Sequence, residues 1–119
     1  MATHNDLGTL GEDLAIDYLI KQGYQILERN YRYQKGEVDI LAKKDDALVA
    51  VEVKTRTGNY FGHPHEFVKP KKIKLLVATV DHYVTQNDLD VEVRFDIIGI
   101  VHAENQFKIE HIEDAFLHF

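Results

Sequence analysis

Two carboxylates and a lysine, Asp39, Glu52 and Lys54, are the residues whose types and spacing best suit a chemical role. Residues 36–56 predict a β-hairpin, because two apolar runs flank a segment of turn composition at Asp45-Asp46. A two- or four-residue turn there places Asp39 directly opposite Glu52, with Lys54 on the same face. A divalent cation between opposed carboxylates removes their repulsion. Oxygen ligands of this kind suit Mg²⁺ or Mn²⁺, and Lys54 can reach a water bound at that metal.

The same pairing predicts one apolar face and one mixed face for the hairpin. The expected core face consists of Val38, Ile40, Ala42, Val49, Val51 and Val53. The other face is apolar near the turn, at Leu41, Leu48 and Ala50, and charged at the far end, where Glu37 opposes Lys54. A solvated face with Glu37–Lys54 and Glu52–Lys54 ion pairs is the alternative to a metal site, and the residues alone leave both open.

Composition predicts an ordinary globular protein with one domain over residues 1–119. The 119 residues are 45% hydrophobic and 29% charged. Cysteine is absent, which excludes disulfides and thiolate catalysis. No apolar run approaches the ~20 residues that span a bilayer, and the N-terminal stretch does not read as a signal peptide. We therefore expect a cytoplasmic protein without a membrane partner.

The net charge of −6 argues mildly against a nucleic-acid partner, but the charge is unevenly spread. Residues 81–119 contain all of the excess acid, and Arg94 and Lys108 are their only arginine and lysine. The acidity therefore lies away from the hairpin.

Periodicity and turn signals predict the order α-β-β-β-α-β-β, an α/β fold with a mixed five-stranded sheet flanked by helices. A first helix is capped by Asn5 or Asp6 and ends at Gly23. The expected strands are residues 24–33, the two arms of the hairpin, 91–101 and 107–112, and a second helix opens at Lys69-Pro70. Residues 57–68 form a loop, and residues 113–119 form a short terminal helix.

Glu12 on the first helix has two interpretations. The expected apolar stripe of that helix is Leu7, Leu10, Leu14, Tyr18 and Leu19. Glu12 flanks it, and Gly8 leaves that face open to close approach. Thr9 and Glu12 also have the spacing of a capping box, which the residues alone favour.

Lysines gather at the start of the second helix, whose apolar stripe is Ile73, Leu76, Val77, Val80 and Val84. Cations there oppose the helix dipole, and a lysine-rich helix N-terminus suits phosphate. A solvated basic turn is the alternative. Tyr60, an aromatic in the preceding loop, could contact a substrate base. Arg94 and Asp96 are expected to form a structural pair.

The assembled motifs resemble the YraN-like bacterial proteins, predicted nucleases of the PD-(D/E)xK superfamily related to archaeal Holliday junction resolvases. The resemblance covers about residues 8–101. Its elements are Gly11-Glu12 with Ala15 and Leu19, Gly23-Tyr24, Arg29–Arg32, Gly36–Ile40, Val51–Arg56, Lys72 and Arg94–Asp96. Val38 stands where the superfamily name has proline.

The resemblance implies a restriction-endonuclease-like core and a Mg²⁺- or Mn²⁺-dependent endonuclease acting on DNA, with branched or junction DNA as the substrate class. Asp39 and Glu52 would bind the metal, Glu12 would approach it, and Lys54 would orient the attacking water. Lys72 would contact phosphate, and we add Lys71, Arg56 and Tyr60 as DNA-binding candidates. The main alternative is a nucleic-acid-binding module with the same fold and no turnover, and a further alternative is an interaction protein.

Paired cutting of a four-way junction requires two sites, so a homodimer is a further expectation. The apolar tail of residues 115–119 could be its surface. The alternative is that the tail folds back onto its own sheet.

Overall fold

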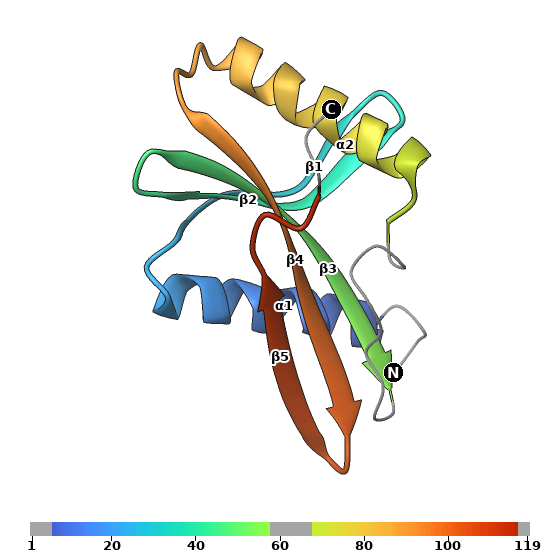
Figure 1. Cartoon of the computed structure of the whole chain (residues 1–119). Coiled ribbons are helices and arrows are strands. Elements are labelled where there is room, and N and C mark those ends of the chain that lie inside the picture. The colour runs from blue at the N-terminus through green and yellow to red at the C-terminus, as the bar shows by residue number, and fades with distance from the viewer. Residues whose placement is uncertain (1–5, 58–67, 117–119) are drawn as a thin grey trace.

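A computed structural model describes residues 6–57 and 68–116 of the chain. The elements follow the predicted order (Figure 1). They are α1 (Asp6–Lys21), β1 (Gln25–Tyr33), β2 (Gly36–Lys44), β3 (Ala47–Thr57), α2 (Pro70–Gln86), β4 (Glu92–Ala103) and β5 (Gln106–Ile112). Residues 113–116 are not helical, so the described part of the expected terminal helix is wrong.

The five strands form one mixed sheet in the order β1-β2-β3-β4-β5. Only β3 and β4 are parallel, because α2 lies in the connection between them. Strands β2 and β3 pair from Lys44/Ala47 to Ile40/Val51. This is the predicted register, and it follows from the two-residue turn at Asp45-Asp46.

Helices cover both faces of the sheet, with α1 on one side and α2 on the other (Figure 1). The cluster under α1 contains Ile40, Ala42, Val49 and Val51 as predicted, together with Ile98 and Ile100 from β4. The second cluster lies under α2 and contains Leu41, Leu48 and Ala50, so the turn end of the mixed face is core as well.

Val38 departs from the expected face. It packs in the α2 cluster and not with Ile40, at the end of β2 beyond its last pair with β3. Strand β2 remains paired there with β1, through Val38 and Tyr31. The alternation of side chains along β2 is therefore interrupted between Ile40 and Val38, where β2 separates from β3.

A glycine sets the distance between α1 and the sheet, but it is Gly11 and not Gly8. A Cβ at Gly11 would overlap the Thr55 hydroxyl on β3, whereas a Cβ at Gly8 would meet nothing. Ala15 and Leu19 are fully buried beyond it. Leu10, expected in the apolar stripe, is 42% exposed.

Helix α2 begins at Pro70 as predicted and buries Leu76, Thr79, Val80 and Tyr83. Val77, expected in the stripe, is exposed. The tail folds back: Ala115 donates its amide to the Phe95 carbonyl at 2.7 Å, and Phe116 packs beside Phe95. This part of the tail therefore belongs to the chain's own core, and the remainder, residues 117–119, lies outside the described residues.

Within the described part of the chain, neither helix has the length and apolar character needed to cross a membrane.

Candidate metal and nucleic-acid site

Asp39 lies where β2 and β3 part. The described ladder between them ends at Ile40 and Val51. One residue further, the Asp39 carboxylate accepts a hydrogen bond of 2.8 Å from the main-chain N–H of Val53. The side chain thereby takes over a bond that a continued ladder would make, and it is held at the end of the hairpin beside Glu52.

Glu52 is almost completely buried, with 4% of its side chain exposed, and its nearest cation is Lys72 of α2. Lys72 Nζ lies 2.7 Å from Glu52 Oε2. The geometry is that of an ion pair and not of an aligned hydrogen bond, so Oε2 has no hydrogen-bond partner among the described residues. A buried acceptor without a partner is costly in a stable fold and is a feature that a bound cation would satisfy.

The surroundings of Asp39 and Glu52 move the pKa values of the two carboxyl groups in opposite directions. Burial and the hydrogen bond and charge of Glu52 raise the pKa of Asp39 to about 8. Burial acts in the same direction on Glu52, but the hydrogen bond from Asp39 and the contact with Lys72 outweigh it and lower the pKa of Glu52. The pair is therefore a protonated Asp39 beside an ionised Glu52.

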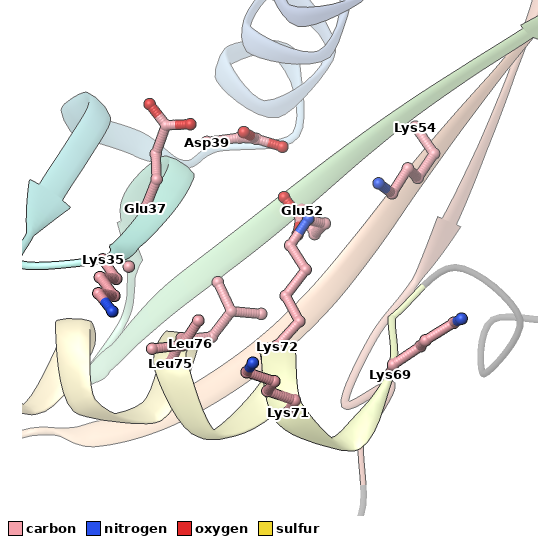
Figure 2. A pocket seen from close by; sticks show the side chains of 11 residues that line it. Lys35, Glu37, Asp39, Glu52, Lys54, Lys69, Lys71, Lys72, Leu75 and Leu76 are labelled. Carbon is pink, nitrogen blue, oxygen red and sulfur yellow. The ribbon is translucent and has the colours of Figure 1, made fainter.

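Lys54 follows on β3 and lines the same cavity as Asp39 and Glu52 (Figure 2). Burial and the charge of Lys72 lower the pKa of Lys54. The alternative pairing of Lys54 with Glu37 is wrong, because Glu37 forms its ion pair with Arg32 at 2.8 Å.

Glu12 lies on the wall of a smaller cavity of about 340 Å³, together with Asp39, Glu52 and Lys54. Its Oε1 accepts hydrogen bonds from Arg29 Nε at 3.3 Å and Asn30 Nδ2 at 3.4 Å. The capping box is wrong, because α1 already begins at Asp6 and Thr9 lies inside it. Among the described residues no three acidic or histidine side chains are close enough together to hold a metal, so Glu12 is near the pair but not joined to it.

A larger cavity of about 620 Å³ opens between the hairpin and the start of α2. Figure 2 shows its lysines around the carboxylate pair, and five line it: Lys35, Lys54, Lys69, Lys71 and Lys72. Lys35 and Lys69 were not among the predicted site residues. Lys35 lies beside the cavity because the next residue, Gly36, packs directly against α2. A Cβ at Gly36 would overlap Thr79 and the Leu75 carbonyl of α2. The sequence signal for Lys35 was a lysine followed directly by a glycine in the turn between two strands.

The remaining predicted DNA contacts are dispersed. Arg56 lines the smaller cavity with Glu12, and Lys71 is exposed at the mouth of the larger one. Tyr60 lies outside the described residues.

The family model described as "Uncharacterised protein family UPF0102" matches residues 11–100. The chain belongs to this family. A UPF0102 protein of Flavobacterium psychrophilum is 59% identical over 119 residues, all of both chains. One from Christiangramia forsetii has the same identity and coverage. A third, from Parabacteroides distasonis, is 46% identical over 116 residues, which are 98% of this chain and 96% of the relative.

A second polar cluster of this UPF0102 chain surrounds Asp96, which is fully buried. Arg94 forms two hydrogen bonds of 2.9 Å to its carboxylate, and His111 Nε2 lies 2.7 Å from it. Arg94 also donates to the Tyr24 hydroxyl at 2.6 Å, and Tyr18 lies 3.0 Å from the other nitrogen of His111. The predicted structural pair Arg94–Asp96 is confirmed, and it joins α1, β4 and β5.

Proposed function

We propose that this UPF0102 protein is a metal-dependent endonuclease that hydrolyses phosphodiester bonds of DNA. The observation that carries the proposal is that Asp39 and Glu52 line the same cavity, where one buried Glu52 oxygen lacks a hydrogen-bond partner among the described residues. The pair opens into a cavity lined by five lysines. Acidic oxygens next to clustered ammonium groups fit a cation and a phosphate together, which is what phosphodiester hydrolysis requires.

The residues fit Mg²⁺ or Mn²⁺ as the cation. Asp39 and Glu52 would hold it through hard oxygen ligands, and Glu12 on the adjoining wall would need to leave Arg29 to contribute. Such a metal supplies Lewis-acid chemistry: it polarises a phosphate oxygen and lowers the pKa of a bound water.

In the proposed reaction, basic residues of the chain contact the attacking water and the phosphates. Lys54 keeps its ammonium at the cavity wall and donates hydrogen bonds to the attacking water or to a phosphate oxygen. Lys71 and Lys72 bind the phosphate backbone at the start of α2, and Arg56 binds it from the end of β3. Burial of Glu52 strengthens every charge interaction made there.

A non-catalytic nucleic-acid-binding module remains the second candidate. The Lys72–Glu52 contact favours it, because an internal ammonium already neutralises Glu52. In that case the lysines would bind phosphate and the carboxylates would serve the fold.

A cleavage assay separates the two functions. Labelled duplex, flap and four-way-junction DNA are incubated with the protein in Mg²⁺, Mn²⁺ or EDTA, beside Glu52→Gln and Lys54→Met variants. The proposal expects cleavage that requires the metal and is lost in both variants, with branched DNA preferred. Binding to DNA without cleavage under every condition would identify the binding module.

Junction cutting would additionally require a dimer, which we retain as part of the proposal. Ala115 and Phe116 pack on the chain's own sheet and are partly buried there, so the tail is not a free apolar surface over these two residues. Sedimentation with and without junction DNA tests the dimer separately from cleavage.

A further inference from the structure

The contact between Lys72 and Glu52 joins a fixed group to a movable one. Glu52 is 4% exposed and sits in the middle of the sheet, whereas the Lys72 side chain is 43% exposed and extends from the first turn of α2. Figure 2 shows the Lys72 chain crossing the cavity to reach the carboxylate. Lys72 can therefore withdraw into the open cavity by rotating its side chain, but Glu52 cannot follow.

The Lys72 ammonium lies where a cation is needed to balance the negative charge of the carboxylates. Its Nζ lies 2.7 Å from Glu52 Oε2, the length of a charge-assisted contact. That same oxygen has no aligned hydrogen bond from any described residue, so the ammonium neutralises its charge without satisfying its lone pairs. A divalent cation with directional oxygen coordination would serve the carboxylate better.

We propose that Lys72 is an exchangeable substitute for the metal: it neutralises Glu52 while the site lacks a divalent cation, leaves when the cation binds, and then contacts a nucleic-acid phosphate. This inference rests on the proposed function, because it assigns the cation and the phosphate to the same site.

The exchange couples the two ligands. In the metal-free protein, Lys72 is engaged and unavailable to phosphate. Metal binding releases its charge toward the cavity, where Lys69 and Lys71 already lie. The first turn of α2 has no acidic residue and no side-chain cap that would capture the released ammonium. Metal should therefore strengthen phosphate binding, and phosphate should strengthen metal binding by the same factor.

The test compares Lys72→Met with Lys71→Met. Both variants remove one charge from the first turn of α2, but only Lys72 contacts Glu52. Calorimetric titration with Mn²⁺ alone, without DNA, should show roughly tenfold tighter binding in Lys72→Met than in wild type, because no ammonium competes for the carboxylate. Lys71→Met should differ from wild type by no more than about twofold, since it changes only the long-range field.

A second measurement uses the unaltered chain and does not depend on how the variants fold. An amine-reactive acetylating reagent is applied with and without saturating Mn²⁺, and each lysine is followed by mass spectrometry. Lys72 should react several-fold faster with the metal present, and Lys71 should not change.

The outcomes distinguish this inference from the proposed function. Equal Mn²⁺ affinities in the two variants with unchanged Lys72 reactivity would overturn the exchange and leave the metal site standing. Mn²⁺ binding that Asp39→Asn does not weaken, or no binding in wild type, would overturn both.

Discussion

The Asp39 carboxylate accepts the main-chain N–H of Val53 at 2.8 Å, across the end of the β2–β3 pair. An acid of the proposed metal site thus also closes a gap in the sheet. The two roles respond differently to substitution, because an amide oxygen can accept the Val53 hydrogen bond but is a poor ligand for a metal that prefers carboxylate.

Asp39→Asn should leave the fold intact and remove the metal effect. The side chain is protonated at neutral pH, so asparagine resembles it in charge and shape. In EDTA the variant should melt at or above the wild-type temperature. In Mg²⁺ the wild type should gain stability through binding and the variant should gain less. Thermal unfolding followed by circular dichroism measures both.

Asp39→Ala is the matched control, because it removes the acceptor as well as the charge. Leaving the Val53 amide without a partner should reduce the free energy of unfolding in EDTA by about 1–2 kcal/mol. Equal stability of the alanine and asparagine variants would contradict a structural role for this hydrogen bond.

Stability in EDTA should fall as pH rises from about 5 to 8. The pKa of Asp39 is raised to about 8 in the folded chain, well above about 3.9 in an unfolded one. The native state therefore binds more protons in this window, and the free energy of unfolding drops by at most about 1.4 kcal/mol per pH unit. Urea unfolding of wild type and Asp39→Asn isolates the effect, since the two proteins share every other titratable group. If the free energy of unfolding changed with pH in the same way in both proteins, this assignment to Asp39 would be refuted.

Gly11→Ala should destabilise the chain by about 1–3 kcal/mol, because the new Cβ would overlap the Thr55 hydroxyl. Gly8→Ala is the control: it meets nothing on the same helix and should be neutral or stabilising by up to about 1 kcal/mol. Adding Thr55→Ala should recover part of the Gly11→Ala loss. Urea denaturation of the wild type and these three variants decides, and no recovery would mean that the Thr55 hydroxyl is not what the new Cβ meets.

Asp96→Ala should cost about 3–5 kcal/mol of unfolding free energy, since it strands Arg94 without its buried partner. Glu113→Ala removes the other, 61% exposed carboxylate beside Arg94 and should cost less than about 1 kcal/mol. Hydrogen bonds with His111 and Arg94 outweigh burial and hold the pKa of Asp96 below its usual value. Its contribution should therefore be present above about pH 4 and be lost as pH falls further. Similar losses in the two variants would contradict this assignment.

Lys71→Ala should weaken binding to duplex DNA without regard to sequence and reduce the salt slope of log K by about 1. Lys74→Ala removes an equally exposed charge from the same helix, outside the cavity lining, and should change the slope less. Fluorescence anisotropy over a range of salt concentrations measures the slopes. Identical slopes for wild type and Lys71→Ala would remove Lys71 from the interface.

The sequence predicted the features that depend on local geometry. Turn composition at Asp45-Asp46 predicted the β2–β3 register, which holds from Lys44/Ala47 to Ile40/Val51 and brings Asp39 beside Glu52 at its end. Pro70 marked the start of α2, because proline fits the first turn of a helix, where its missing N–H leaves no hydrogen bond unmade.

Features that depend on packing between distant segments were not predictable. Val38 packs in the α2 cluster, at the end of β2 that no longer pairs with β3, and Glu12 contacts Arg29 of β1. The engagement of Lys72 with Glu52 required the position of α2 over the sheet. Periodicity within one element contains no information on which element will cover it.

The crossover through α2 gives the site an order of assembly during folding. Asp39 and Glu52 meet through a short hairpin, whereas Lys72 reaches them only after α2, which follows later in the chain, has packed over the hairpin. Local pairs form faster than distant ones, so we expect the carboxylates to come together before their lysine arrives. A divalent cation present at that moment would neutralise them earlier, and refolding in Mg²⁺ should consequently be faster than in EDTA.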